Sequence, residues 1–257
     1  MKTAILQELA SLEQEHKIKI LYAVESGSRA WGFASTNSDW DVRYIYIHHP
    51  DWYLSIDEKK DSQEKILSND IDLAGWELRK ALRLFRKSNP PMLEWLRSPT
   101  IYSENYTTAT QLRELTKTYF NPKSCLHHYL HMAEGNYKDY LQRDLVRVKK
   151  YFYVLRPILA CEWIKHTNTM APMEFQHLVE SQVHDSSVKK EIAQLLAKKI
   201  MGEELNEGPR IDLLNTFIDE RISYYNEYVK TLGTYMQPDT DKLNSLFKLT
   251  LDEAWSL

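Results

Sequence analysis

Three aspartates in the N-terminal third of the chain have the spacing of a metal-binding site. Asp39 and Asp41 are two residues apart at the start of a run rich in Val, Ile and Tyr, and Asp72 lies in a later extended run. Side chains two apart on a strand point to the same side. Two carboxylates so placed raise each other's pKa unless a cation lies between them. Magnesium suits such a site because it binds a few carboxylates together with waters and substrate phosphates. With Asp72, the three carboxylates predict a site for two ions about 3.5–4 Å apart, as used in in-line phosphoryl displacement.

A glycine-serine pair lies just before these aspartates and directly after an extended run. Gly27 allows the backbone to approach a ligand closely, and the amides around Ser28, at the start of a short helical turn, can face phosphate oxygens. Arg29 follows and can also reach a phosphate. A Gly-Ser pair or an Asp-x-Asp pair alone is common in exposed turns. Their combination in this order is what predicts a phosphate-transfer site.

Hydrophobic periodicity predicts which elements position these residues. The first 17 residues have the pattern of an amphipathic helix, and extended runs are expected from Ile18 to Gly27, over 41–49 and over about 66–76. In the second run, alternate residues should face opposite sides of a sheet. From Leu78 the period becomes helical.

The second half of the chain is predicted to be helical. An asparagine followed by proline, Asn121-Pro122, is typical of a helix start. Further helices are expected at about 146–166, 172–181, 187–201, 210–232 and 240–255. The fold class is therefore α+β, with a mixed β-sheet flanked by helices in a domain over residues 1–120 and an all-helical domain over residues 121–257.

The string SGSRAWGFASTNSDWDVRYIY resembles the polymerase-β-type nucleotidyltransferases, and most closely the bacterial RNA-repair-pathway-associated DNA polymerase β family. The resemblance continues in IDLAGWELRKALRLFRKSNPPMLEWLRSP and in HHYLHMAEGNY and KKYFYVLRPILACEWI, and so covers most of residues 20–165 before it fades. It implies that the first domain is a nucleotidyltransferase palm and that the helical domain closes over a nucleotide.

The resemblance also implies a role for each residue of the motif. Gly27 and Ser28 would hold the triphosphate of a nucleotide, while Asp39 and Asp41 would bind magnesium, with manganese as an alternative. Asp72 would complete the metal site and help to deprotonate the attacking hydroxyl. The implied reaction moves a nucleoside monophosphate from a nucleoside triphosphate to a hydroxyl acceptor and releases pyrophosphate, which is the chemistry of an EC 2.7.7 transferase.

Asp70 competes with Asp72 for the third carboxylate position. Both would face the same side of a continuous strand because they are two residues apart. The family pattern Asp-Leu-x-Gly-Trp falls on Asp72, and we therefore favour Asp72.

A helix in the second domain carries a basic and aromatic stripe. Lys149, Tyr153 and Arg156 lie at positions i, i+4 and i+7 and so share one face. If this face lies against the first domain, it can bind triphosphate and stack on a base. The alternative is an ordinary amphipathic helix whose long cations lie along its rim. The sequence does not separate these two interpretations.

Other cations near the motif have simpler explanations. For Arg43 we favour pairing with an acidic neighbour on an adjacent strand. Lys80 and Arg83 fall on the polar side of their helix and are expected to be solvated.

Composition narrows the classes of protein. The formal net charge is −3 and the pI about 6.3, which gives no support for nonspecific binding to a nucleic-acid duplex. Glutamates interrupt the N-terminus where a signal peptide needs an apolar stretch, and no apolar run is long enough to cross a bilayer. The only cysteines, Cys125 and Cys161, lie far apart. We therefore expect a cytoplasmic protein with no membrane partner.

The sequence does not identify the molecule that accepts the nucleoside monophosphate. An RNA end, a protein side chain and a small molecule all carry a suitable nucleophile. A non-catalytic nucleotide-binding or interaction module on the same fold is the alternative to an enzyme. The presence of all three aspartates favours the enzyme.

Overall fold

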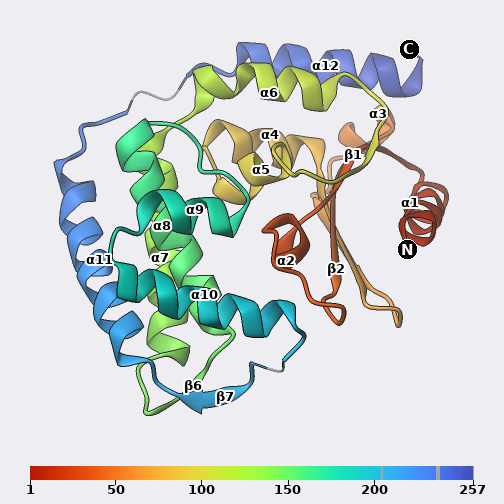
Figure 1. Ribbon diagram of the computed structural model, residues 1–257. Helices are drawn as coiled ribbons and strands as arrows, with labels where there is room; N and C mark the ends of the chain where they lie inside the picture. Colours follow the sequence, from red (N-terminus) through yellow and green to blue (C-terminus); the bar gives the residue numbers. More distant parts are fainter. Residues whose placement is uncertain (204, 236–237, 257) are drawn as a thin grey trace.

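The computed structural model of the chain describes residues 1–203, 205–235 and 238–256 (Figure 1). The first half holds α1 (Lys2–His16), β1 (Ile18–Glu25), α2 (Gly27–Ala30), β2 (Trp40–His48), α3 (Pro50–Tyr53), β3 (Ser62–Ile66), β4 (Ile71–Glu77), α4 (Leu78–Arg86), α5 (Pro90–Trp95), β5 (Ile101–Glu104) and α6 (Thr108–Tyr119). The second half holds α7 (Pro122–Tyr140), β6 (Leu145–Arg147), α8 (Lys150–Thr167), α9 (Phe175–Gln182), α10 (Ser186–Ile200), β7 (Glu207–Pro209), α11 (Asp212–Thr231) and α12 (Asp241–Trp255).

A five-stranded mixed sheet of order β3-β4-β2-β1-β5 forms the centre of the first half. β2 and β4 are parallel, and the other neighbouring pairs are antiparallel. The parallel pair brings the starts of β2 and β4 to the same end of the sheet, where β1 ends. The residues that begin β2 and β4 therefore lie beside the loop that follows β1.

The two faces of the sheet are buried by different elements. Val42, Tyr44 and Tyr46 of β2 pack with α1, and Ile45 and Ile47 face the larger core formed with the other helices (Figure 1). This alternation confirms the period-two pattern predicted for the strand. By the same alternation, Asp41 and Arg43 lie on the face of β2 that carries Ile45 and Ile47 and is covered by the helices.

The helical half begins as the sequence predicts. Asn121 caps α7 by accepting a hydrogen bond from the Ser124 amide at 3.0 Å, and Pro122 is the first helical residue. α8, α9, α10, α11 and α12 all fall near their predicted ranges. The α+β fold class is confirmed.

Two details of the predicted elements are wrong. The run over 66–76 is not one strand, because it divides into β3 and β4 around a turn in which Asp70 has a φ of 62°. The second half is not purely helical, because β6 and β7 form a two-stranded antiparallel sheet. Both strands of that pair are three residues long, too short for a periodic signal.

One large hydrophobic core extends through both halves of the chain. It contains strand residues such as Leu21 and Ile45 as well as residues of the last helix such as Leu246. α12 returns to the first half and packs on α4 and α6 (Figure 1). Among the described helices, none has a stretch long and apolar enough to cross a membrane.

Candidate functional site

The loop after β1 lies directly against a carboxylate of β2. Gly27 has a φ of 59°, and a Cβ built on it would lie 2.0 Å from Oδ2 of Asp41. The Ser26 amide donates to the Asp41 carbonyl at 2.8 Å, which joins the loop to the start of β2. Glycine is therefore required here by backbone conformation and by space. The close approach that this glycine permits is to the Asp41 side chain.

We expect Gly27→Ala to destabilise the protein more than Gly32→Ala. Both glycines have positive φ, but a Cβ at Gly32 would meet nothing within 4 Å. Gly32→Ala should cost about 1–2 kcal/mol of unfolding free energy from backbone strain alone, and Gly27→Ala should exceed it because Asp41 must move. Urea unfolding of both variants measures the difference. Equal losses would contradict a tight Gly27–Asp41 contact.

Asp41 and Asp72 lie side by side on the parallel strands β2 and β4. They are direct register partners, and the guanidinium of Arg43 joins them, with Nη2 3.0 Å from Asp41 Oδ1 and 2.9 Å from Asp72 Oδ2. Burial raises the pKa of Asp41, Arg43 opposes this rise, and repulsion from Asp72 and Asp39 adds to it. The strand begins at Trp40, so Asp39 and Asp41 do not share a strand as predicted, whereas Arg43 pairs with acidic neighbours as favoured from the sequence.

The structure separates the two rivals for the third carboxylate. Asp70 lies in the turn before β4, and its carbonyl accepts a hydrogen bond from the Trp40 amide at 2.7 Å. Only Asp72 is inside the strand and paired with Asp41. Strand register thus places Asp72 in the candidate site and Asp70 outside the strand.

Asp39 lies just before β2 and is exposed. It is close enough to raise the pKa of Asp41, but it does not join the Arg43 cluster. Among the described residues, no three His, Cys, Asp or Glu side chains converge closely enough to hold a metal ion.

The Asp41–Asp72 pair nevertheless has the chemistry of a magnesium site that substrate completes. Magnesium needs only one or two carboxylates when waters and phosphates supply the other ligands. The Arg43 guanidinium contacts both carboxylates and already neutralises part of their charge. Asp41 and Asp72 are therefore the residues of this cluster whose chemistry suits a magnesium ion, beside the Gly27 loop.

Arg29 makes contacts with the loop that follows it. Its Nη2 donates to the Ser38 carbonyl at 2.7 Å and its Nε to the Asp39 carbonyl at 3.1 Å, while its guanidinium stacks 3.7 Å from the Trp40 ring centroid. These contacts fix the loop that carries Asp39. Support of this loop by the Arg29 side chain therefore competes with the predicted phosphate contact.

The helical half supplies the opposite wall of the site. Lys149 precedes α8 and is exposed, and the largely buried Tyr153 follows one turn later. Burial raises the pKa of Tyr153, and the negative charges of Asp41 and Asp39 raise it further. Lys149 in turn helps to lower the pKa of Asp41. Lys149 and Tyr153 are therefore near enough to the aspartates for their charges to interact.

A cavity of about 490 Å³ opens beside this wall. Arg147, Lys149, Lys150 and Tyr153 line it together with residues of the 205–207 segment. Lys150 lies 4.8 Å from the Tyr153 ring centroid. The cavity thus combines cations and an aromatic ring with one acidic residue, Glu207, and none of the three aspartates lines it.

Arg156 belongs to a different environment, and its assignment to the exposed stripe is wrong. Its side chain is buried, and its Nη1 donates to Glu94 Oε1 at 2.8 Å. The same carboxylate oxygen accepts a hydrogen bond from Tyr129 at 2.5 Å. The i+7 position turns into the core because α8 is covered on this side by α5 and α7.

Two charged residues near the site were not predicted from the sequence. Glu25, the last residue of β1, is buried and accepts hydrogen bonds from the Tyr102 hydroxyl and, at 2.9 Å, from the Asp41 amide. Burial raises the pKa of Glu25. Lys199 of α10 donates to Ser35 and Ser38 in the loop before Asp39, at 3.2 and 3.4 Å. Glu25 could have been noticed because it lies two residues before Gly27. No motif near Lys199 in the sequence indicates that it reaches this loop.

The fold and site define a nucleotidyltransferase-like protein of the polymerase-β type. A model of the RlaP family, described as the RNA repair pathway DNA polymerase beta family, matches residues 1–248, and the chain belongs to this family. It is similar to the uncharacterized protein YcgL of Bacillus subtilis (strain 168), with 49% identity over 255 residues that cover 99% of this chain and 98% of that protein.

A solved structure gives a weaker likeness. The crystal structure of a nucleotidyltransferase-like protein from Exiguobacterium sibiricum 255-15 aligns with a TM-score of 0.32 and 14% identity, over 96% of this chain and 89% of that one. This likeness is too weak to support a conclusion about the site.

Proposed function

We propose that the protein is a magnesium-dependent nucleotidyltransferase that moves a nucleoside monophosphate from a nucleoside triphosphate to a hydroxyl acceptor, with release of pyrophosphate. The observation that supports this most strongly is the placement of the Gly27 loop directly against Asp41, which pairs in register with Asp72. A glycine loop at the start of a short helix beside paired carboxylates is suited to a metal-bound phosphate chain.

The residues of the two walls have separate tasks in this proposal. The amides around Ser28 bind phosphate oxygens, and Lys149 brings positive charge from the opposite wall. Tyr153 offers an aromatic ring to the base. Bound magnesium, or manganese, neutralises phosphate charge in such a reaction. In this proposal these residues together orient the triphosphate and the acceptor, and such positioning supplies much of the acceleration in phosphoryl transfer.

Asp72 is the proposed proton acceptor for the attacking hydroxyl. Its side chain is 35% exposed, which leaves one edge of the carboxylate open to solvent and substrate. Arg43 holds the other edge and orients it. The acceptor itself is an RNA end, a protein side chain or a small molecule, and the acidic net charge weighs against a long nucleic acid.

A transfer assay tests the proposal. The protein is incubated with each α-labelled nucleoside triphosphate, magnesium and an extract of the source cells, and labelled products are separated by size and by nuclease or protease sensitivity. We expect label in one product with wild-type protein and none with Asp41→Asn. Incubation with chelator is the control for metal dependence. Labelling that persists in Asp41→Asn would assign the activity to another protein.

A non-catalytic nucleotide-binding module is favoured by one observation. Arg43 neutralises both Asp41 and Asp72, as a structural ion-pair network would. In a module, triphosphate binding should be unaffected by magnesium and by Asp41→Asn. Calorimetry with a nonhydrolysable triphosphate, with and without magnesium, separates the two functions, because the proposed enzyme binds magnesium only weakly until the triphosphate is present.

A further inference from the structure

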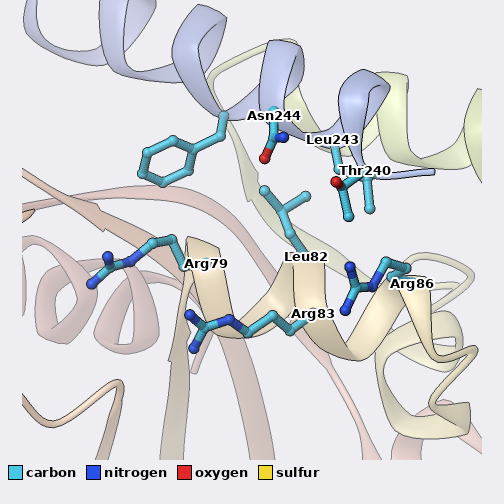
Figure 2. A pocket seen from close by; sticks show the side chains of 8 residues that line it. Arg79, Leu82, Arg83, Arg86, Thr240, Leu243 and Asn244 are labelled. Atoms are coloured by element: carbon cyan, nitrogen blue, oxygen red, sulfur yellow. The ribbon is translucent and has the colours of Figure 1, made fainter.

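A second, smaller cavity lies between α4 and α12, away from the aspartates. It has a volume of about 240 Å³ (Figure 2). Arg79, Arg83 and Arg86 line it from α4, and Thr240, Asn244 and Phe247 line it from α12. Leu82 points toward α12, and both Leu82 and Leu243 are buried. No acidic side chain lines this cavity within the part of the chain that the structure describes.

The three arginines are not held in close ion pairs, although Arg79 and the exposed Arg83 also line a neighbouring cavity with Asp57, Glu58, Asp61 and Glu77. The Arg79 Nε lies 3.9 Å from Glu77, whose carboxylate also accepts from the Tyr53 hydroxyl at 2.6 Å. Within the described ranges, Arg83 and Arg86 take part in no ion pair. Arginine is always charged at neutral pH. Like charges three and four residues apart on a helix destabilise it, so this row of guanidinium groups has a cost that a bound anion removes.

Arg86 adds an independent sign of a missing partner. Its Nε is buried and has no hydrogen-bond partner among the described atoms. Buried polar atoms are nearly always paired, and an unpaired one needs an explanation such as an unseen ion. Asp239 and Asp241 influence the same tyrosine, Tyr119, as Arg86 does, but within the described ranges neither forms an ion pair with Arg86.

The remaining wall of the cavity suits an organic phosphate. The guanidinium groups of Arg79 and Arg83 extend to the same side of α4 (Figure 2). Guanidinium groups bind phosphate through paired N–H donors. Thr240 provides a hydroxyl and Asn244 an amide, and the Phe247 ring contributes an apolar surface.

The cavity is separate from the candidate active site. Asp72 lies near the start of β4, and α4 begins after its end at Glu77. A strand rises about 3.3 Å per residue, so the five residues between Asp72 and Glu77 span roughly 17 Å. None of the residues that line the cavity belongs to the candidate active site.

We propose that this cavity binds a second ligand carrying at least two phosphate groups, with Arg79, Arg83 and Arg86 as its phosphate-binding residues. The shared chemistry is a phosphate chain, supplied by a nucleoside polyphosphate or by inorganic polyphosphate. Its binding joins α4 to α12 and so fastens the C-terminal helix to the sheet domain. The proposal does not depend on the transferase activity proposed above.

The test uses tripolyphosphate and ADP as separate probes, on the full chain and in the presence of chelator so that metal-dependent binding at the aspartates is suppressed. Affinity is measured by calorimetry, and the site is located by hydrogen exchange. Arg83→Gln is compared with Lys87→Gln, which removes one positive charge at the C-cap of the same helix, outside the cavity. Thermal melts establish that both variants are folded.

We expect both probes to slow amide exchange at the start of α12 in the wild type. Arg83→Gln should weaken binding by about tenfold or more, and Lys87→Gln by less than about twofold. Tighter binding of ADP than of tripolyphosphate identifies a nucleotide as the ligand, and the reverse order identifies inorganic polyphosphate. Equal effects of the two variants, or exchange protection confined to the Gly27 loop, would overturn the proposal.

Discussion

Replacement of Asp72 by asparagine should leave triphosphate affinity within a few-fold of the wild type and reduce turnover by about 10²–10⁴-fold, the effect of losing a general base. Asparagine keeps the shape of the side chain, and Arg43 retains its 3.0 Å contact with Asp41. The lost charge also removes one of the repulsions that raise the pKa of Asp41. The fold should therefore survive, while the proton acceptor is lost.

Asp70→Asn is the matched control for this experiment. It removes the same charge two residues away, at a turn position outside β4. A thermal melt, a triphosphate-binding curve and a turnover assay on each variant separate folding, binding and chemistry. Wild-type turnover in Asp72→Asn, with turnover lost in Asp70→Asn, would reverse our assignment of the third carboxylate. Tight triphosphate binding with no transfer by the wild type would instead support the module.

Replacement of Arg156 by alanine should reduce the free energy of unfolding by about 3–5 kcal/mol, because it leaves the Glu94 carboxylate buried without its cation. The Arg156 and Glu94 side chains are only 4% and 10% exposed. Tyr129 remains as a hydrogen-bond donor to Glu94 but carries no positive charge. Urea unfolding measures the loss. Triphosphate affinity of the folded variant should be unchanged.

Two companion variants interpret this result. Arg156→Met combined with Glu94→Leu should recover much of the stability, because apolar residues often replace a buried ion pair without loss. Lys149→Ala should show the reverse pattern. Its triphosphate binding should be weaker, while its free energy of unfolding stays within about 0.5 kcal/mol of the wild type. A stable Arg156→Ala variant that cannot bind triphosphate would return Arg156 to the nucleotide site.

The sequence by itself determined the elements that carry the candidate site. The alternation in β2, the helix start at Asn121-Pro122 and the placement of Gly27 before Asp41 are local patterns, and each was predicted because side-chain period and backbone conformation depend on near neighbours. The family resemblance added the roles of these residues, and family membership is confirmed over residues 1–248. The nucleotide and metal contacts remain predictions.

Only the tertiary structure decided which charged residues meet. The register of the parallel β2–β4 pair placed Asp72 beside Asp41, and the turn at Asp70 broke the run that made the two aspartates equivalent in the sequence. Packing of α5 against α8 buried Arg156 on Glu94, although helical periodicity gave it the same face as Lys149. Lys199 reaches Ser35 across 164 positions of the chain. Periodicity shows which residues share a face of a helix or strand. It does not show which element packs on that face, because this depends on burial and pairing between distant segments of the chain.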